Sequence, residues 1–101
     1  MSFQVLLTEL ADTDLRAILR RMSKFATPAK VDQWQSDFYE ALESLEELPA
    51  RCPLIKDEIP VNGLRQLLFD NYRIIFSVED EVVLVVHIRH QHQQSLTADD
   101  F

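Results

Sequence analysis

The stretch Leu64–Gln91 constrains the fold of this chain most, because it predicts three consecutive β-strands joined by two tight turns. Strands are expected over Leu64–Phe69, Tyr72–Val78 and Glu81–Arg89. The turns are expected at Asp70-Asn71 and Glu79-Asp80, where Asn and Asp tolerate left-handed backbone angles. A chain with this feature contains an antiparallel sheet as its core.

The apolar content of this stretch is too continuous for a sheet with one wet face. Ile74–Phe76 and Val82–Val86 are expected to be buried on both sides. Five basic or imidazole side chains interrupt it, namely Arg65, Arg73, His87, Arg89 and His90. Such groups inside a sheet require partners, either structural or functional.

Two helices are predicted before the sheet. Thr8 is a suitable N-cap, and apolar residues at helical spacing predict a helix over Glu9–Lys24. Thr27-Pro28 starts a second helix of about 20 residues, with an apolar stripe that continues to Leu48 before Pro49 stops it. The link between the helices is short, so they are expected to form an antiparallel hairpin.

The remaining segments complete a single domain over residues 1–101. The run Phe3–Leu7 predicts a first strand that neighbours the later sheet, and 50–62 is an irregular connection whose Cys52, Leu54 and Ile55 pack against the core. Gly63 allows an unusual backbone angle. Residues 92–101 form a polar tail or short last element, anchored by Leu96 and Phe101. The order predicts an α+β fold in which the hairpin covers one face of an antiparallel sheet of three or four strands.

Composition indicates a cytoplasmic protein without a membrane span. No apolar run approaches the roughly 20 residues that cross a bilayer. The N-terminus lacks the basic n-region and the cleavage site of a secretory signal, and a single cysteine excludes an intrachain disulfide. The net charge is −7, which disfavours long-range attraction to nucleic acid. In the sheet segment, however, the acids gather at the turns, so its faces are expected to be locally positive.

Metal, cofactor and thiol chemistry have weak support. On an extended strand His90 and His92 share a face and His87 points to the other, which makes a poor zinc site. Cys52 has an arginine neighbour that could lower its pKa, but a lone cysteine is more often a small buried residue. The chain has one glycine, so a glycine-rich phosphate loop is excluded. We expect no metal and no cofactor.

Phosphodiester cleavage is the remaining enzymatic hypothesis. It requires an acid, a base and cations around the phosphate. Arg73 supplies a cation, Arg65 and Arg89 add to it, and His90 acts as acid or base. The alternative is structural: Arg65 and Arg73 pair with acids or donate hydrogen bonds to loop carbonyls.

Several short motifs together resemble one known family. The motifs are Gly63-Leu64-Arg65, Asn71–Phe76, Val83–His90, the start Val5–Thr8 with Ala11 and Asp14-Leu15, and the helical set Phe38, Ala41-Leu42, Leu45 and Pro49. In order and spacing they are similar to the RelE/ParE superfamily of toxins from type II toxin–antitoxin systems, over about residues 4–92. The resemblance implies a helical hairpin packed on a curved antiparallel sheet, and a cognate antitoxin that folds onto it.

The superfamily divides in function, and the resemblance implies different roles in each branch. RelE-like members cleave mRNA on the ribosome, and Arg73 and His90 match positions that serve such toxins in catalysis. ParE-like members inhibit DNA gyrase by protein–protein contact, and no catalytic residue is then needed. Arg65, Arg73 and Arg89 would then be structural or bind the antitoxin.

Departures from the RelE pattern favour the ParE-like branch. No tyrosine follows the last strand in 91–96, and Leu67, Leu68 and Phe69 stand where basic residues are expected in a ribosomal nuclease. The expected function is therefore a plasmid-stabilisation toxin that arrests growth through gyrase. The alternatives are a RelE-like mRNA endoribonuclease and a toxin-fold domain that has lost toxicity. Because the chain is acidic, its antitoxin is expected to bind through an apolar segment with cations set against the acidic helix.

Overall fold

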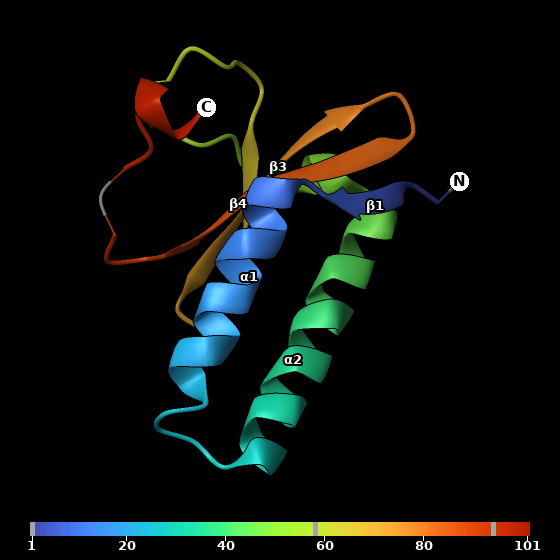
Figure 1. Cartoon of the computed structure of the whole chain (residues 1–101). Coiled ribbons are helices and arrows are strands. Elements are labelled where there is room, and N and C mark those ends of the chain that lie inside the picture. The colour runs from blue at the N-terminus through green and yellow to red at the C-terminus, as the bar shows by residue number, and fades with distance from the viewer. Residues whose placement is uncertain (1, 58, 94) are drawn as a thin grey trace.

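The computed structural model describes residues 2–57, 59–93 and 95–101 (Figure 1). The elements in chain order are β1 Gln4–Leu7, α1 Glu9–Met22, α2 Pro28–Glu43, β2 Arg65–Phe69, β3 Tyr72–Glu79 and β4 Val82–His90. Short 3-10 turns at Ser44–Glu46, Pro49–Arg51 and Ala98–Asp100 complete the list. This order confirms the predicted α+β fold.

The sheet is mixed, which corrects the expectation of a wholly antiparallel one. Its strand order is β1-β4-β3-β2, and β2, β3 and β4 form the predicted antiparallel meander. β1 joins β4 in parallel, with Leu6 opposite Leu84. β1 therefore lies beside the last strand of the meander rather than the first.

Both helices start directly after the N-cap residues that the sequence predicted, Thr8 and Thr27. Thr8 Oγ1 accepts from the Ala11 N–H at 3.1 Å, and Thr27 Oγ1 accepts from the Lys30 N–H at 3.3 Å. The two helices lie side by side and antiparallel on one face of the sheet (Figure 1). α1 ends two residues before the predicted Lys24.

α2 ends at Glu43, earlier than the prediction that extended it to Leu48. Its last turn tightens into the 3-10 turn, where the Ser44 hydroxyl donates to the Ala41 carbonyl at 2.6 Å. The Arg51 guanidinium then caps the carbonyls of Ser44, Glu47 and Leu48. The tightening places Leu45 in the core, while Leu48 takes a left-handed angle and stays exposed.

The turns of the meander use the predicted residue types with one shift. Asp70 has φ +52° and Asp80 has φ +53°, both in the left-handed region. The second turn lies at Asp80-Glu81, one residue later than predicted, because β3 continues through Glu79. Gly63 has φ +80°, the unusual angle expected before the sheet.

Two apolar clusters lie on opposite faces of the sheet. The main core joins the helices to the sheet through residues that include Leu15, Phe38, Ile74, Phe76 and Val85. A smaller cluster on the outer face joins Leu64, Ile75 and Leu96, with Ile55 packed against it. The second cluster explains why Ile74–Phe76 is buried throughout, as predicted. The same expectation is wrong for Leu84, which is 36% exposed. Leu54 was expected to pack against the core with Cys52 and Ile55, but its side chain is exposed.

Residues 95–101 lie over the outer face, where Leu96 is buried as predicted and Phe101 remains partly exposed. The Ala98–Asp100 turn has a capping box between Thr97 and Asp100. None of the helices in the described part of the chain has the length and apolarity that crossing a membrane needs.

Candidate functional site

The outer face of the sheet carries Arg73 and Arg89, whereas Arg65 lies opposite Phe76 on the helix-covered face, and each of the three has a partner. Strand pairing sets Arg73 opposite Arg89, so their side chains share one face. Residues 52–57 and 59–62 of the connection before β2, and residues 91–93 and 95–101, cover this face. A hollow of about 540 Å³ remains between them, lined by Arg73, Gln66, Asp57 and neighbouring polar residues.

Arg73 is held by a two-pronged ion pair. Its Nη2 donates to Asp57 Oδ1 at 2.8 Å, its Nη1 to Oδ2 at 3.3 Å, and its Nε to Gln66 Oε1 at 2.8 Å. The side chains of Arg73 and Asp57 are only 13% and 6% exposed. All three guanidinium nitrogens are therefore engaged within the protein, and the charge is compensated.

Asp57 is stabilised as a carboxylate. Burial raises its pKa, but hydrogen bonds from Arg73 and from the Leu96 N–H, together with the charge of Arg73, outweigh burial and hold the pKa below its usual value. The Leu96 N–H donates to Asp57 Oδ2 at 2.6 Å. One carboxylate thus joins β3, the loop and the C-terminal segment.

Arg65 donates to the carbonyls of Ala50 at 3.2 Å and Cys52 at 2.6 Å. This is the loop-carbonyl arrangement that the sequence offered as its structural role. Arg89 Nη1 lies 3.3 Å from Asp100 Oδ1. The Thr97 N–H, which donates to Asp100, lowers the pKa of that carboxyl, and the charge of Arg89 lowers it further against the opposing effect of burial.

The structure does not bring Arg73 and His90 together. His90 pairs with Tyr72 in the sheet register, whereas Arg73 pairs with Arg89, so the two side chains project from opposite faces. The His90 ring contacts Tyr72 edge-on, with centroids 5.3 Å apart. The two roles proposed for a nuclease therefore lie on different sides of the sheet.

The other predicted chemical groups have structural partners. Cys52 is buried, and burial raises the pKa of its thiol despite the opposing charges of Arg51 and Arg65. His87 lies under the C-terminal segment, with Nδ1 3.3 Å from Asp14 Oδ2 and Nε2 2.7 Å from the Asp100 carbonyl. Within the described ranges, no group of three His, Cys, Asp or Glu side chains could hold a metal ion.

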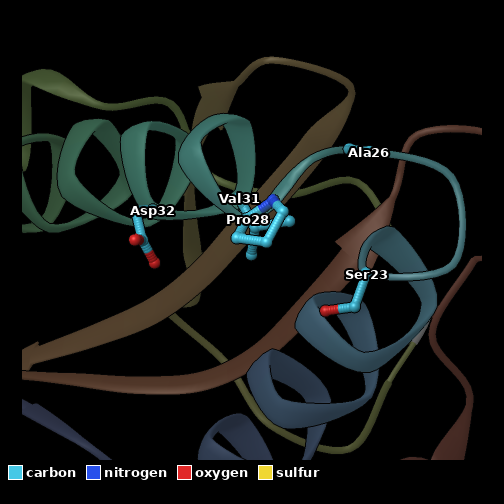
Figure 2. Close-up of a pocket in the computed structure, with 5 residues that line it drawn as sticks. All are labelled: Ser23, Ala26, Pro28, Val31 and Asp32. Carbon is cyan, nitrogen blue, oxygen red and sulfur yellow. The ribbon is translucent and has the colours of Figure 1, made fainter.

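A second hollow, of about 200 Å³, lies where the helices meet (Figure 2). Ser23 comes from the end of α1, and Pro28, Val31 and Asp32 come from the start of α2. The Ser23 hydroxyl donates to the Leu19 carbonyl at 2.8 Å, which assigns it to ending the helix. This hollow holds no pair of groups for acid–base chemistry.

Sequence reasoning missed the acidic partners Asp14, Asp57 and Asp100, and it missed Arg21 beside Tyr72. Thr97 and Asp100 have the three-residue spacing of a capping box, which could have identified the last turn. Asp57 carried no such signal, because long-range pairing from a loop has no local pattern.

Comparison with known proteins identifies the family. Residues 5–95 match the family model described as ParE toxin of the type II toxin–antitoxin system parDE. A solved chromosomal ParDE toxin–antitoxin system from P. aeruginosa aligns with TM-score 0.74 at 21% identity, over 88% of this chain and 96% of that one. The RelBE2 toxin–antitoxin complex from Mycobacterium tuberculosis aligns with TM-score 0.61 at 18% identity, over 89% and 99% of the two chains. No curated protein sequence matches the chain. The family match covers most of the sequence, and the chain therefore belongs to the ParE toxins of type II toxin–antitoxin systems.

Proposed function

We propose that this toxin acts by protein–protein contact with DNA gyrase and is neutralised by a cognate antitoxin. One observation carries the preference over mRNA cleavage: Arg73 is neutralised by Asp57 and lies on the opposite sheet face from His90. A phosphodiester cleaving site needs cation, acid and base around one phosphate. The net charge of −7 also disfavours docking on ribosomal RNA.

The antitoxin is proposed to dock beside β1 and α2. A mainly apolar hollow of about 300 Å³ lies there, lined by Val5, Leu7, Tyr39, Leu42, Glu43 and Glu46. In the described sheet β1 pairs only with β4, so its other edge has no partner strand. Apolar lining with a carboxylate rim suits an apolar segment that carries cations.

The function is tested by inducible expression with and without the adjacent open reading frame. We expect growth arrest only without it, loss of supercoiling when purified toxin is added to gyrase, and intact mRNA in the arrested cells. Cleaved mRNA with active gyrase would instead favour the ribonuclease alternative. Normal growth without the neighbouring gene would contradict toxicity altogether.

The docking site is tested by Tyr39→Arg. A cation in the acidic-rimmed hollow should repel a cationic segment and remove apolar contact, so antitoxin binding is expected to weaken about tenfold or more. Phe25→Arg is the control, because Phe25 is also an exposed aromatic but lies at the far tip of the hairpin, outside this hollow. Equal losses in both variants would count against this location.

A further inference from the structure

A cluster of hydrogen-bond donors lies at the end of the sheet, on the face opposite Arg73. A hollow of about 410 Å³ is lined by Arg21, Tyr72, His90, His92 and Gln93. These side chains come from three places: the last turn of α1, the start of β3, and the end of β4 with the residues that follow it. Among the described residues, no carboxylate lines the hollow, although the chain as a whole is acidic.

The hydrogen bonds within the cluster show which of its donors stay available to a ligand. The Arg21 Nη2 donates to the Tyr72 hydroxyl oxygen at 3.4 Å, which leaves the hydroxyl hydrogen to point elsewhere. The His92 N–H donates to His90 Nδ1 at 3.1 Å, so the proton of the neutral His90 ring sits on Nε2. The nearby acid Asp70 is already engaged, because its Oδ2 accepts from the Trp34 indole at 3.0 Å.

We propose that this hollow binds the phosphoryl group of a phosphate monoester or free phosphate. Arg21 supplies the positive charge, and Tyr72 O–H and His90 Nε2–H supply further donors from other directions. A tetrahedral oxyanion offers an oxygen to each donor, whereas a planar carboxylate offers two. Arg20 and Lys24, both exposed near Arg21, raise the local positive potential.

The Tyr72 ring makes the site rigid. It is 7% exposed and packs edge-on against Trp34, with ring centroids 5.7 Å apart. The His90 and His92 rings lie 5.1 Å apart in a tilted arrangement. A rigid hydroxyl between a guanidinium and an imidazole is preorganised for an anion, because the donors need little reordering on binding.

The experiment is an NMR titration of the full chain with inorganic phosphate, at constant ionic strength and pH 7. Saturable shifts are expected in the His90, His92 and Tyr72 ring signals, with weaker shifts for equal acetate. Arg21→Gln is expected to weaken phosphate binding about tenfold. Tyr72→Phe should weaken it severalfold while keeping the ring in place.

Arg16→Gln is the matched control, because it removes the same charge from the same helix while Arg16 pairs with Asp12 at 2.9 Å outside the hollow. Parallel titrations with phosphoserine and a nucleoside 5′-monophosphate distinguish the source, since tighter binding than inorganic phosphate identifies a monoester. Absence of saturable shifts, equal binding of acetate, or equal losses in Arg16→Gln and Arg21→Gln would overturn the proposal. None of these outcomes bears on the gyrase assay, so this inference and the proposed function fail separately.

Discussion

Asp57 is the residue on which the outer face of the sheet depends. Its two oxygens bind the Arg73 guanidinium, and Oδ2 also accepts the Leu96 N–H. Removing its charge leaves a nearly buried cation without compensation, which is more costly than losing a surface pair. Arg73 is therefore more sensitive to its partner than the exposed arginines are.

Asp57→Asn is expected to lower the free energy of unfolding by about 3 kcal/mol. Urea denaturation of the full chain measures this change. Asp99→Asn is the matched control, because Asp99 is exposed on the Ala98–Asp100 turn, and its effect should stay within about 0.5 kcal/mol. Equal stability of the two variants would mean that the ion pair contributes little.

Acid should weaken the protein through Asp57 and Asp100. Both carboxyls have a folded-state pKa below the usual value, so below about pH 4 the unfolded chain binds more protons than the folded one. Their contribution is fully present above the unfolded pKa and is lost as pH falls through the folded pKa. Urea midpoints measured from pH 6 to pH 2 should therefore fall, and Asp57→Asn should flatten the decline. A decline as steep in that variant as in the parent chain would argue against the assignment.

At the scale of elements, the open edge of β4 beyond β1 is closed by side chains and not by a strand. Thr8 Oγ1 donates to the Val86 carbonyl at 3.3 Å, Asp14 accepts from the Ile88 N–H at 3.0 Å, and Gln93 accepts from the His90 N–H at 2.6 Å. Thr8 also caps α1. A single hydroxyl therefore fastens the first helix to the central strand.

Thr8→Ala is expected to destabilise the chain by about 2 kcal/mol, at the upper end for a helix cap, because it also breaks the bond to β4. Thr27→Ala removes a cap that is exposed and serves α2 alone, so a loss of about 1 kcal/mol is expected. Thermal unfolding of both variants gives the comparison. A larger loss in Thr27→Ala would contradict the double role of Thr8.

The elements themselves were predictable because their signals are local. Thr8, Thr27-Pro28, Asp70 and Asp80 each encode a cap or turn within a few residues. The parallel pairing of β1 with β4, the partners of Arg73 and Arg89, and the return of 91–101 over the sheet depend on contacts far apart in sequence. The sequence alone indicated that the arginines need partners, but it did not indicate which acidic residues pair with them.

At the scale of the whole molecule, the sheet is buried by two unequal layers. Phe38 belongs to the main core, stacked on Trp34 with centroids 5.3 Å apart, whereas Leu96 belongs to the small outer cluster. Both side chains are almost fully buried. A cavity in one layer should nevertheless destabilise a different part of the molecule from a cavity in the other, because only the main core joins both helices to the sheet.

Leu96→Ala is expected to cost about 2–3 kcal/mol and to act locally. Hydrogen exchange should accelerate in 91–101 and in the loop 52–62, while α1 and α2 keep their protection. Phe38→Ala is the comparison, with a cost of about 3–5 kcal/mol and faster exchange throughout. Uniform acceleration in Leu96→Ala would show that the outer cluster is part of one cooperative unit.

The parallel pairing of β1 with β4 sets when the fold can form. Gln4 lies opposite Val82, 78 residues later in the chain, so β1 cannot pair until β4 has been made. Closing so long a loop is entropically costly, and contacts between distant residues slow folding. β4 is also a central strand of the sheet. Until it is made, a nascent chain has its two helices but not the complete sheet against which they pack. The domain therefore gains its structure, and with it any capacity to harm the cell, only after β4 has been made.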